Sequence, residues 1–289
     1  MKVLVTGANG QLGNEIRVIA NNYRGLSFDF HDIDTLDILD YENLKKYFTG
    51  NRPDFVVNCA AYTAVDKAEN DKENALKVNC KIVENLVQLS KMHNSKLIHI
   101  STDYVFDGNQ CIPYKEDDKV NPQGEYGKTK LLGEEEALKY KNSIIIRTSW
   151  LYSSFGNNFV KTMLRLGKEK EQINVIFDQI GTPTYAADLA EAIIVIINKS
   201  VKNKEFYPGI YHYSNEGVTS WYDFAWEIMN LVKLNCYVCP IETKDYPTPA
   251  KRPAYSLLNK NKIKTVYNIS IPNWKDSLKK CLQKLNTTN

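Results

Sequence analysis

Apolar positions along the first half of the chain follow two alternating patterns. Short, unbroken apolar runs are separated by stretches in which apolar residues recur at helical spacing. Unbroken runs are typical of strands buried on both faces of a parallel sheet, and amphipathic helices cover those faces. The sequence therefore predicts an α/β fold with a doubly wound, Rossmann-like parallel sheet. The predicted strands are Val3–Thr6, Leu26–Phe30, Asp54–Ala61, Lys96–Thr102 and Ser143–Arg147, and the predicted helices between them are Leu12–Asn21, Tyr41–Phe48 and Glu73–His93.

The alternation becomes less regular after Trp150. Helical patterns cover 157–170, 185–199, 221–234 and 274–285, and a proline-rich stretch runs from Pro240 to Pro253. We expect residues 1–150 to form a dinucleotide-binding domain whose sheet is extended by a strand near 173–181. Residues 151–289 are then expected to form mainly a smaller α/β lobe that binds substrate.

Composition narrows the class of protein. The 37 basic and 34 acidic residues give a net charge of +3 without a concentrated basic patch, so no nucleic-acid partner is expected. The longest apolar stretch, Ala190–Asn198, is too short to span a bilayer, so no membrane partner is expected either. The N-terminus lacks the pattern of a secretory signal, which predicts a cytoplasmic protein with reduced cysteines. Cys236 and Cys239 form a lone C-x-x-C pair, and plain thiols are favoured over a zinc or redox site.

A glycine-rich loop follows the first predicted strand and opens the first helix. Its three glycines are Gly7, Gly10 and Gly13 in a G-x-x-G-x-x-G spacing. The first permits a tight turn, the second lets backbone approach a pyrophosphate, and the third allows close packing of helix on strand. The helix N-terminus then offers N–H groups and a positive dipole to phosphates. The loop predicts a dinucleotide site.

An acidic residue near the end of the second strand would contact the adenosine ribose of that dinucleotide. Asp29, Asp32 and Asp34 all lie in this region, and Asp32 is favoured because it best closes the strand. A carboxylate there accepts a bond from the ribose 2′-hydroxyl and repels a 2′-phosphate. This favours NADH over NADPH, and the sequence leaves both cofactors open.

A tyrosine and a lysine begin a predicted helix in the middle of the chain. Tyr126 and Lys130 are four residues apart, hence on one helical face. An ammonium beside a phenol favours the phenolate and is expected to lower the pKa of Tyr126 towards a useful range. Thr102 ends a predicted central strand, where ligands bind in doubly wound sheets, and its hydroxyl could polarise a carbonyl beside Tyr126. These three residues are the predicted catalytic set.

The glycine spacing and the Tyr–Lys pair resemble the extended, sugar-nucleotide branch of the short-chain dehydrogenase/reductase superfamily. Further segments are similar to one family in that branch, the dTDP-4-dehydrorhamnose reductases, which catalyse the last step of dTDP-L-rhamnose synthesis. The matching segments span nearly the whole chain and occur in the same order as in the family. The matching segments are Asn58–Glu69, Ser101–Gly108, Arg147–Tyr152, Gly156–Val160, Asp178–Thr184 and Tyr246–Pro253.

The resemblance implies a cofactor site and a substrate site. On the substrate side, Thr102, Asp103, Tyr104 and Trp150 would face the sugar, and Arg252 the diphosphate, which the guanidinium fork suits. The implied cofactor contacts are Gly10, Gln11 and Leu12 at the phosphates, Asp37 and Ile38 at the adenine, and Ala61, Tyr62, Thr63, Tyr126 and Lys130 at the nicotinamide-side ribose.

The expected activity is therefore NAD(P)H-dependent reduction of a dTDP-linked 4-keto sugar. A sugar-nucleotide epimerase with the same three residues, and a cofactor-binding regulatory subunit similar to the β subunit of methionine adenosyltransferase, are the alternatives. Some family members bind magnesium through acidic residues near a dimer interface. Glu15 lies at the corresponding place, but its partner acids cannot be identified, so both Mg²⁺ and a homodimer stay open.

Overall fold

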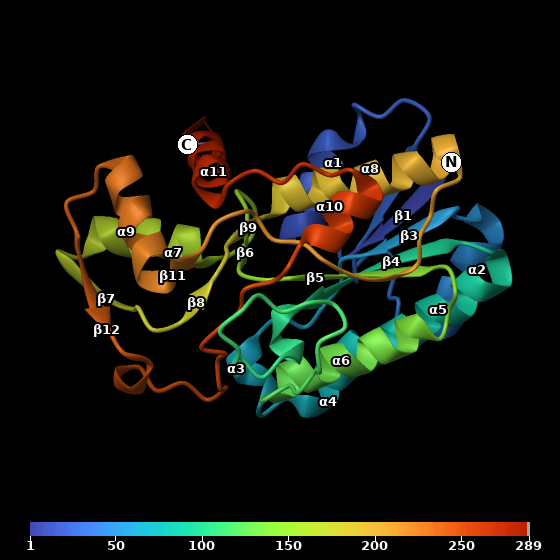
Figure 1. The fold of residues 1–289 in the computed structure, drawn as a ribbon. Coiled ribbons are helices and arrows are strands. Elements are labelled where there is room, and N and C mark those ends of the chain that lie inside the picture. The colour runs from blue at the N-terminus through green and yellow to red at the C-terminus, as the bar shows by residue number, and fades with distance from the viewer. Residues whose placement is uncertain (288–289) are drawn as a thin grey trace.

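The computed structural model describes residues 1–287, and its centre is a parallel sheet of six strands (Figure 1). The strands lie in the order β10-β5-β4-β3-β1-β2, and every neighbouring pair is parallel. The chain runs from β1 out to β2 and then returns to β3 on the other side of β1. The strand order reverses at this point, which is where ligands bind in doubly wound sheets. The strands are β1 (Lys2–Thr6), β2 (Ser27–His31), β3 (Phe55–Asn58), β4 (Lys96–Thr102), β5 (Ser143–Thr148) and β10 (Gly209–His212).

Helices cover both faces of the sheet, as the unbroken apolar strands predict (Figure 1). Successive strand residues point to opposite faces, so Val3 and Val5 join one core and Leu4 joins the other. The predicted fold class is confirmed. One face carries α1 (Gln11–Ala20), α8 (Ala186–Asn203) and α10 (Asn261–Tyr267), and the other carries α2 (Tyr41–Asn51), α5 (Ile82–His93) and α6 (Glu125–Leu138).

The prediction that a strand near 173–181 extends this sheet is wrong. β7 (Gln172–Ile176) pairs instead with β12 (Tyr237–Ile241), and β8 (Ile180–Gly181) pairs with β11 (Thr219–Ser220), each as a separate two-stranded sheet. Exposed and buried residues alternate along β7, as in a strand with one solvated face. The sixth strand is β10, whose four residues are too few to give a clear apolar run.

A second core lies beside the sheet domain and belongs to the C-terminal lobe. It gathers residues from β7, β12 and three helices around Phe224, Trp274 and Leu278. The third of these helices ends at the limit of the described residues (Figure 1). The helices are α7 (Phe159–Glu169), α9 (Trp221–Val232) and α11 (Trp274–Thr287), and the short strands β6 (Leu151–Tyr152) and β9 (Thr184–Tyr185) join the lobe to the end of β5.

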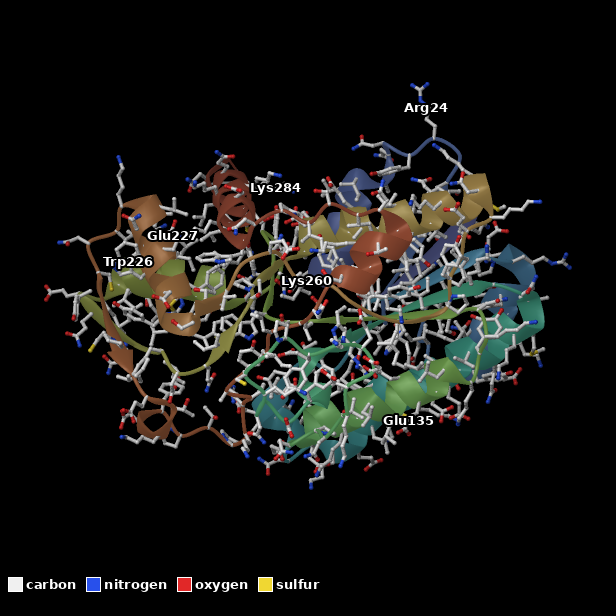
Figure 2. The ribbon with its side chains drawn as sticks, in the orientation of Figure 1. Arg24, Glu135, Trp226, Glu227, Lys260 and Lys284 are labelled. Carbon is white, nitrogen blue, oxygen red and sulfur yellow. The ribbon has the colours of Figure 1, made fainter. Side chains whose placement is uncertain are left out.

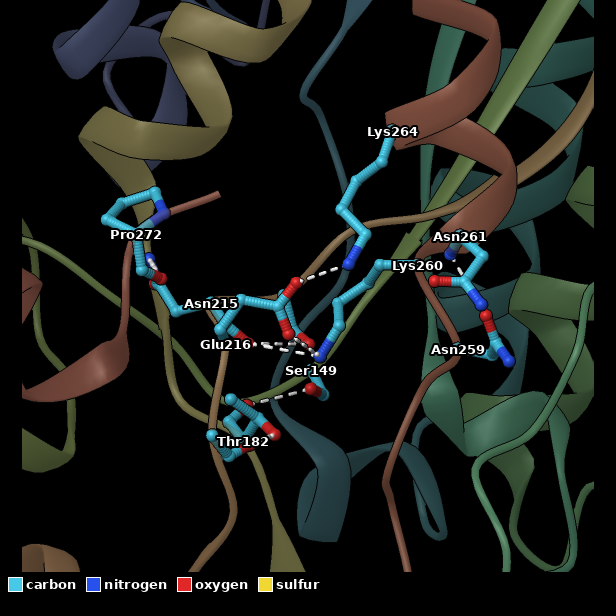
Figure 3. Close-up of polar contacts among 11 residues, drawn as sticks. Ser149, Thr182, Asn215, Glu216, Asn259, Lys260, Asn261, Lys264 and Pro272 are labelled. Atoms are coloured by element: carbon cyan, nitrogen blue, oxygen red, sulfur yellow. Dashed lines mark hydrogen bonds and ion pairs between the residues drawn. The ribbon is translucent and has the colours of Figure 1, made fainter. Parts of the chain in front are cut away.

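A cluster of polar side chains anchors the returning C-terminal segment to the turn after β10 (Figure 3). Lys260, which is buried, lies 3.3 Å from a Glu216 carboxylate oxygen and donates to the Asn215 carbonyl. Lys264 reaches the other Glu216 oxygen at 2.8 Å. Burial lowers the pKa of Lys260, and Glu216 opposes that shift. These contacts fix α10 against the edge of the sheet.

The helix predicted over 73–93 is continuous but contains a wider turn. It consists of α4 (Lys72–Leu76), the π-helical turn η1 (Lys77–Lys81) and α5. The π turn presents Asn79, whose amide nitrogen donates to Thr129 of α6 and whose oxygen accepts from the Tyr62 N–H. α6 packs closely here, because a Cβ added at Gly133 would lie 2.1 Å from the Asn79 carbonyl oxygen. π turns often occur at functional sites, and this one aligns α6 with the loop after β3.

No helix within residues 1–287 is long and apolar enough to cross a membrane. All six cysteines are free thiols. Cys236 is buried in the lobe core and Cys239 is half-buried on β12. In the described part of the chain, no group of three or more His, Cys, Asp or Glu side chains could hold a metal ion.

Candidate active site

The glycine loop connects β1 to α1 at the point where the strand order reverses. Gly7 has a φ of +62°, and a Cβ added there would lie 2.5 Å from the Ala60 backbone nitrogen. Gly10 caps α1 without a side-chain hydrogen bond. A Cβ at Gly13 would lie 2.6 Å from the Ala8 Cα, so this glycine permits close packing. Because these three positions carry no side chain, the loop backbone can approach the phosphates of a dinucleotide closely.

A cavity of about 430 Å³ adjoins the loop on the side of β2. Asp32 lies in it, and its carboxylate accepts from the Asn9 N–H at 2.8 Å and from the Ile33 N–H at 2.9 Å. Asp29 instead accepts from the Tyr47 hydroxyl, and Asp34 is exposed outside the cavity lining. Of the three acids, the structure therefore places only Asp32 at the cavity. The predicted adenine residues Asp37 and Ile38 line the same cavity, together with His31, Leu36, Val78 and Ile82, which sequence reasoning missed.

A second cavity of about 570 Å³ continues from the first past the carboxyl ends of the strands. The two share Gly7, Gly10, Cys59 and Ala61, so they form one cleft. The second cavity alone brings together residues from six separate stretches of sequence. The predicted residues that line the second cavity are Gln11, Leu12, Thr63, Thr102, Asp103, Tyr104, Tyr126, Lys130 and Trp150, and unpredicted ones include Val65, Ile100, Ser101, Ser149 and Asn157.

Lys130 lines this cleft and is almost fully buried. Its ammonium donates to the Ile100 carbonyl oxygen at 2.7 Å. Burial lowers the Lys130 pKa to about 8, while the nearby Glu134 carboxylate acts in the opposite direction. The ammonium is therefore close to its titration point at physiological pH.

Burial raises the Tyr126 pKa to about 12, and the Asp103 charge adds to this effect. Hydrogen bonding by Thr102 acts in the opposite direction. The Lys130 ammonium is directed at the Ile100 carbonyl oxygen, and Lys130 is not among the described groups that shift the Tyr126 pKa. The predicted lowering of the Tyr126 pKa by Lys130 is therefore not found, and the phenol keeps its proton at neutral pH.

Thr102 ends β4, and its hydroxyl is held by the short helix η2 (Asp103–Val105). Thr102 Oγ1 donates to Asp103 Oδ1 at 3.1 Å and accepts from the Tyr104 N–H at 3.2 Å. Burial raises the Asp103 pKa to about 6. The Tyr104 ring meets the Tyr126 ring edge to face, with 5.4 Å between centroids. These contacts define the orientation of the side chains beside the Tyr126 hydroxyl.

A buried ion pair lies one turn beyond Lys130 on α6. Arg147, at the end of β5, contacts both Glu134 carboxylate oxygens, with Nη2 to Oε2 at 2.7 Å and Nε to Oε1 at 2.9 Å. Ser101 also donates to Glu134. This pair ties α6 to β4 and β5 beneath the cleft. Sequence reasoning missed it, although the spacing of Tyr126, Lys130 and Glu134 at every fourth residue was a usable signal.

Three predicted ligand residues do not line the cleft, namely Gly13, Tyr62 and Arg252. Arg252 pairs with Asp66 of α3 (Val65–Ala68), with guanidinium–carboxylate distances of 2.8 and 2.7 Å. Tyr62 turns its hydroxyl to Asp71 instead, at 2.9 Å. Neither the Asp66 partner of Arg252 nor the Asp71 partner of Tyr62 was predicted from sequence. Asp66 and Arg252 are 186 residues apart, and no local pattern connects them.

The surroundings of Glu15 do not fit a magnesium site within one chain. Its carboxylate is buried, accepts from the Ser153 hydroxyl at 2.7 Å and pairs with Lys284 at 3.1 Å. Figure 2 labels Lys284 on α11, next to the sheet domain. A lysine supplies positive charge where a cation would otherwise be needed. We therefore assign no metal ion to Glu15.

Proteins that combine this sheet, a glycine loop at its switch point and a Tyr–Lys pair at the cleft form the short-chain dehydrogenase/reductase class, and the chain has that architecture. A family model described as the RmlD substrate binding domain matches residues 1–287. The chain belongs to this family, and most of its similar curated relatives are named dTDP-4-dehydrorhamnose reductase, as the resemblance of its segments predicted.

Individual relatives match over their full lengths. The dTDP-4-dehydrorhamnose reductase of Aggregatibacter actinomycetemcomitans is 41% identical over an alignment of 288 residues, which covers 96% of this chain and 97% of the relative. The crystal structure of the reductase from Clostridium acetobutylicum has a TM-score of 0.93 and 41% identity, covering 99% of this chain and 100% of that one. The Bacillus anthracis reductase, solved in complex with NADP, has a TM-score of 0.93 and 37% identity, covering 98% and 99%.

Proposed function

We propose that the protein reduces the 4-keto group of dTDP-4-dehydro-L-rhamnose to give dTDP-L-rhamnose, with NADH or NADPH as reductant. The observation that carries this proposal is the meeting of Thr102, Tyr126 and Lys130 in one cleft beside the glycine loop. The names of the relatives support the substrate, and the NADP complex of the Bacillus anthracis relative supports the class of cofactor. We retain a cytoplasmic location as part of the proposal.

A nicotinamide bound in the cleft supplies the hydride that reduces carbon 4 of the sugar. Tyr126 is proposed to donate its phenolic proton to the oxygen that becomes the hydroxyl group. Its pKa of about 12 keeps that proton in place until negative charge develops on the substrate oxygen. Thr102 is proposed to hydrogen-bond the same oxygen, because donors aimed at developing charge make large contributions to catalysis.

Lys130 is proposed to hold the nicotinamide-side ribose and to place a positive charge near the substrate oxygen on which negative charge develops. Its burial strengthens any interaction with a negative charge, since few waters screen it. At neutral pH a pKa of about 8 leaves the side chain mostly protonated. The chain's own residues thus provide one proton donor, one hydroxyl group and one buried positive charge.

The substrate side of the proposal uses the wall of the cleft that faces the lobe. Asp103, Tyr104 and Trp150 line it together with Thr102 and are proposed to contact the sugar. Arg252 is proposed to contact the diphosphate, and it must exchange its bond to Asp66 for one to a phosphate oxygen. Only a few placed donors are needed, which agrees with the net charge of +3.

The proposal is tested by replacing Tyr126 with Phe and following NADH or NADPH oxidation with enzymatically made dTDP-4-dehydro-L-rhamnose. We expect kcat to fall by about 10²–10³, the usual cost of removing one group that acts only in the transition state. Cofactor binding should be retained. Tyr237→Phe is the matched control, because Tyr237 is 63% exposed and lies on β12, far from the cleft lining.

Unchanged turnover in Tyr126→Phe would show that another group donates the proton. If the wild-type protein oxidised neither cofactor with this or any other 4-keto sugar nucleotide, the regulatory alternative would replace the proposal. Tightly bound NAD that co-purifies with the protein, together with turnover that needs no added reductant, would instead indicate an epimerase.

A further inference from the structure

Trp150 has an uncommon backbone conformation at the wall of the cleft. It lies between β5 and β6 with a φ of +49°, in the left-handed region that bulky side chains rarely occupy. Its carbonyl accepts from the Thr184 N–H at 3.1 Å, and the neighbouring Ser149 hydroxyl donates to the Thr182 carbonyl at 2.9 Å. Such strain persists only where the surroundings fix it, and it is concentrated at functional sites.

The Trp150 ring is held by two residues of the lobe. The indole of Trp221 stacks on it, with ring centroids 3.6 Å apart and an interplanar angle of 10°. Gly181 lies against the same ring, because an added Cβ there would be 2.8 Å from Trp150 Cε2 and Cζ2. Gly181 and Trp221 belong to connected elements. Gly181 lies on β8, which pairs with β11, and Trp221 begins α9 directly after β11.

Trp221 is itself held in place by neighbouring residues of the lobe. Its ring lies 4.6 Å from the Phe159 ring, and Ser220 caps α9 by accepting from the Asp223 N–H. Among the described residues Trp150 lines the cleft and Trp221 does not, so any effect of Trp221 on a ligand passes through Trp150. Trp221 also packs against the lobe core, so its ring connects that core to the Trp150 indole.

We propose that Trp221 and Gly181 are positioning residues that hold the Trp150 indole against the sugar of the nucleotide-sugar substrate. Trp221 supports the ring by stacking, and Gly181 leaves the space that the ring occupies. The two residues together set the position of one wall of the sugar subsite and therefore which sugar fits. This inference deepens the proposed function and rests on it.

The test compares four variants by their KM for dTDP-4-dehydro-L-rhamnose, their kcat and their affinity for NADPH. Trp221→Leu removes the stack, and an aromatic contact worth up to about 1.5 kcal/mol corresponds to a rise in substrate KM of about tenfold. Trp221→Phe should restore most of the affinity. Trp226→Leu is the matched control, since Trp226 lies on the same helix (Figure 2), is 50% exposed and does not line the cleft.

Gly181→Ala tests the same inference without touching Trp221 or the lobe core. The Gly181 φ is not in the left-handed region, so the backbone accepts alanine and only the Trp150 ring must move. We expect a similar rise in substrate KM, with NADPH affinity within about twofold of the wild type. Near-UV circular dichroism provides a readout that does not depend on turnover, because two indoles stacked at 3.6 Å couple their transitions. The coupled signal should be lost in Trp221→Leu and altered in Gly181→Ala.

The inference is overturned if Trp221→Leu loses the coupled signal yet keeps the wild-type substrate KM. It is also overturned if Trp226→Leu raises KM as much as Trp221→Leu does, because a general weakening of the lobe would explain both. Failure of the proposed function is distinguishable, since it would appear as absent turnover in the wild-type protein itself.

Discussion

Tyr126 and Lys130 are one helical turn apart, and burial moves their pKa values in opposite directions. It favours the neutral form of each, so the Tyr126 pKa rises to about 12 and the Lys130 pKa falls to about 8. At pH 7 both side chains carry their protons. As the pH rises, the ammonium is therefore lost first and the phenol much later. The alkaline limit of activity should belong to Lys130.

We expect kcat/KM to fall as the pH rises through about 8, because deprotonation of Lys130 removes the positive charge beside the reacting groups. The measurement is a pH–rate profile of the wild type and of Lys130→Arg, whose guanidinium stays protonated throughout this range. The variant should have lower activity but no decline near pH 8. The same decline in Lys130→Arg would assign the titration to a different group.

Asp32 is the residue that should decide between the two cofactors. Its carboxylate lies in the cavity beside β2 and would repel a 2′-phosphate there. We expect the wild type to prefer NADH, and Asp32→Asn to raise kcat/KM for NADPH relative to NADH by about tenfold, which corresponds to 1.4 kcal/mol. Asn keeps the oxygen that accepts from the Asn9 N–H while removing the charge.

Asp34→Asn provides the matched control for this prediction. It removes the same charge two residues away, at an exposed position outside the cavity lining. Its ratio of NADPH to NADH activity should equal that of the wild type. If Asp34→Asn changes the ratio and Asp32→Asn does not, the acid at the ribose has been misassigned.

At the scale of elements, α6 presents Tyr126, Lys130 and Glu134 on one face, and Glu134 attaches the helix to the sheet. Glu134 is 1% exposed and its partner Arg147 is 2% exposed. Removing one member of a buried pair leaves the other charge without compensation. The position of the two catalytic candidates therefore depends on an ion pair that lies outside the cleft.

We expect Glu134→Gln to lower the free energy of unfolding by about 3 kcal/mol, the lower end of the usual cost of breaking a buried pair. Chemical denaturation of wild type and variant measures this difference. Glu135→Gln is the control, because Glu135 is the next residue of α6, exposed on its outer side (Figure 2), and should change stability by less than about 0.5 kcal/mol. Equal effects of the two substitutions would show that Arg147 does not need Glu134.

The elements also show what sequence patterns can and cannot predict. Unbroken runs such as Ser143–Arg147 identified central strands of the sheet, because a strand buried on both faces must be apolar throughout. The predicted strand Leu26–Phe30 overlaps β2, which is partly exposed at the edge of the sheet. β10 was missed because Gly209–His212 is too short to show a pattern, and the π turn was missed because it does not interrupt helical periodicity. Motifs with fixed spacing, such as Tyr126 and Lys130, placed side chains in the cleft correctly.

At the scale of the whole molecule, local patterns fail where distant segments meet. Arg252 pairs with Asp66, Lys284 with Glu15 and Trp221 with Trp150, and each pair joins a residue beyond 200 to one within residues 1–150. Sequence position alone does not indicate such contacts, because they depend on how the lobe rests on the sheet domain. The cleft lies between these two parts, so contacts across it control access and fit.

The Asp66–Arg252 pair provides a test of how the lobe takes part in substrate binding. It joins the loop after η3 (Thr243–Asp245) to α3, next to Val65 in the lining of the cleft. The Arg252 guanidinium holds the Asp66 pKa below its usual range, so the pair is fully charged at neutral pH. A diphosphate that binds Arg252 must compete with this carboxylate.

Two substitutions should therefore act in opposite directions on the KM for the nucleotide sugar. Arg252→Gln removes the phosphate contact and should raise KM by about tenfold, as expected for loss of one charged hydrogen bond. Asp66→Asn removes the competing charge and should lower KM, while the KM for NADH stays constant in both variants. Steady-state kinetics with each substrate varied in turn measures these changes. An equal rise of KM in both variants would mean that the pair holds the loop in place and that Arg252 does not leave it, which would assign the diphosphate to other residues of the cleft.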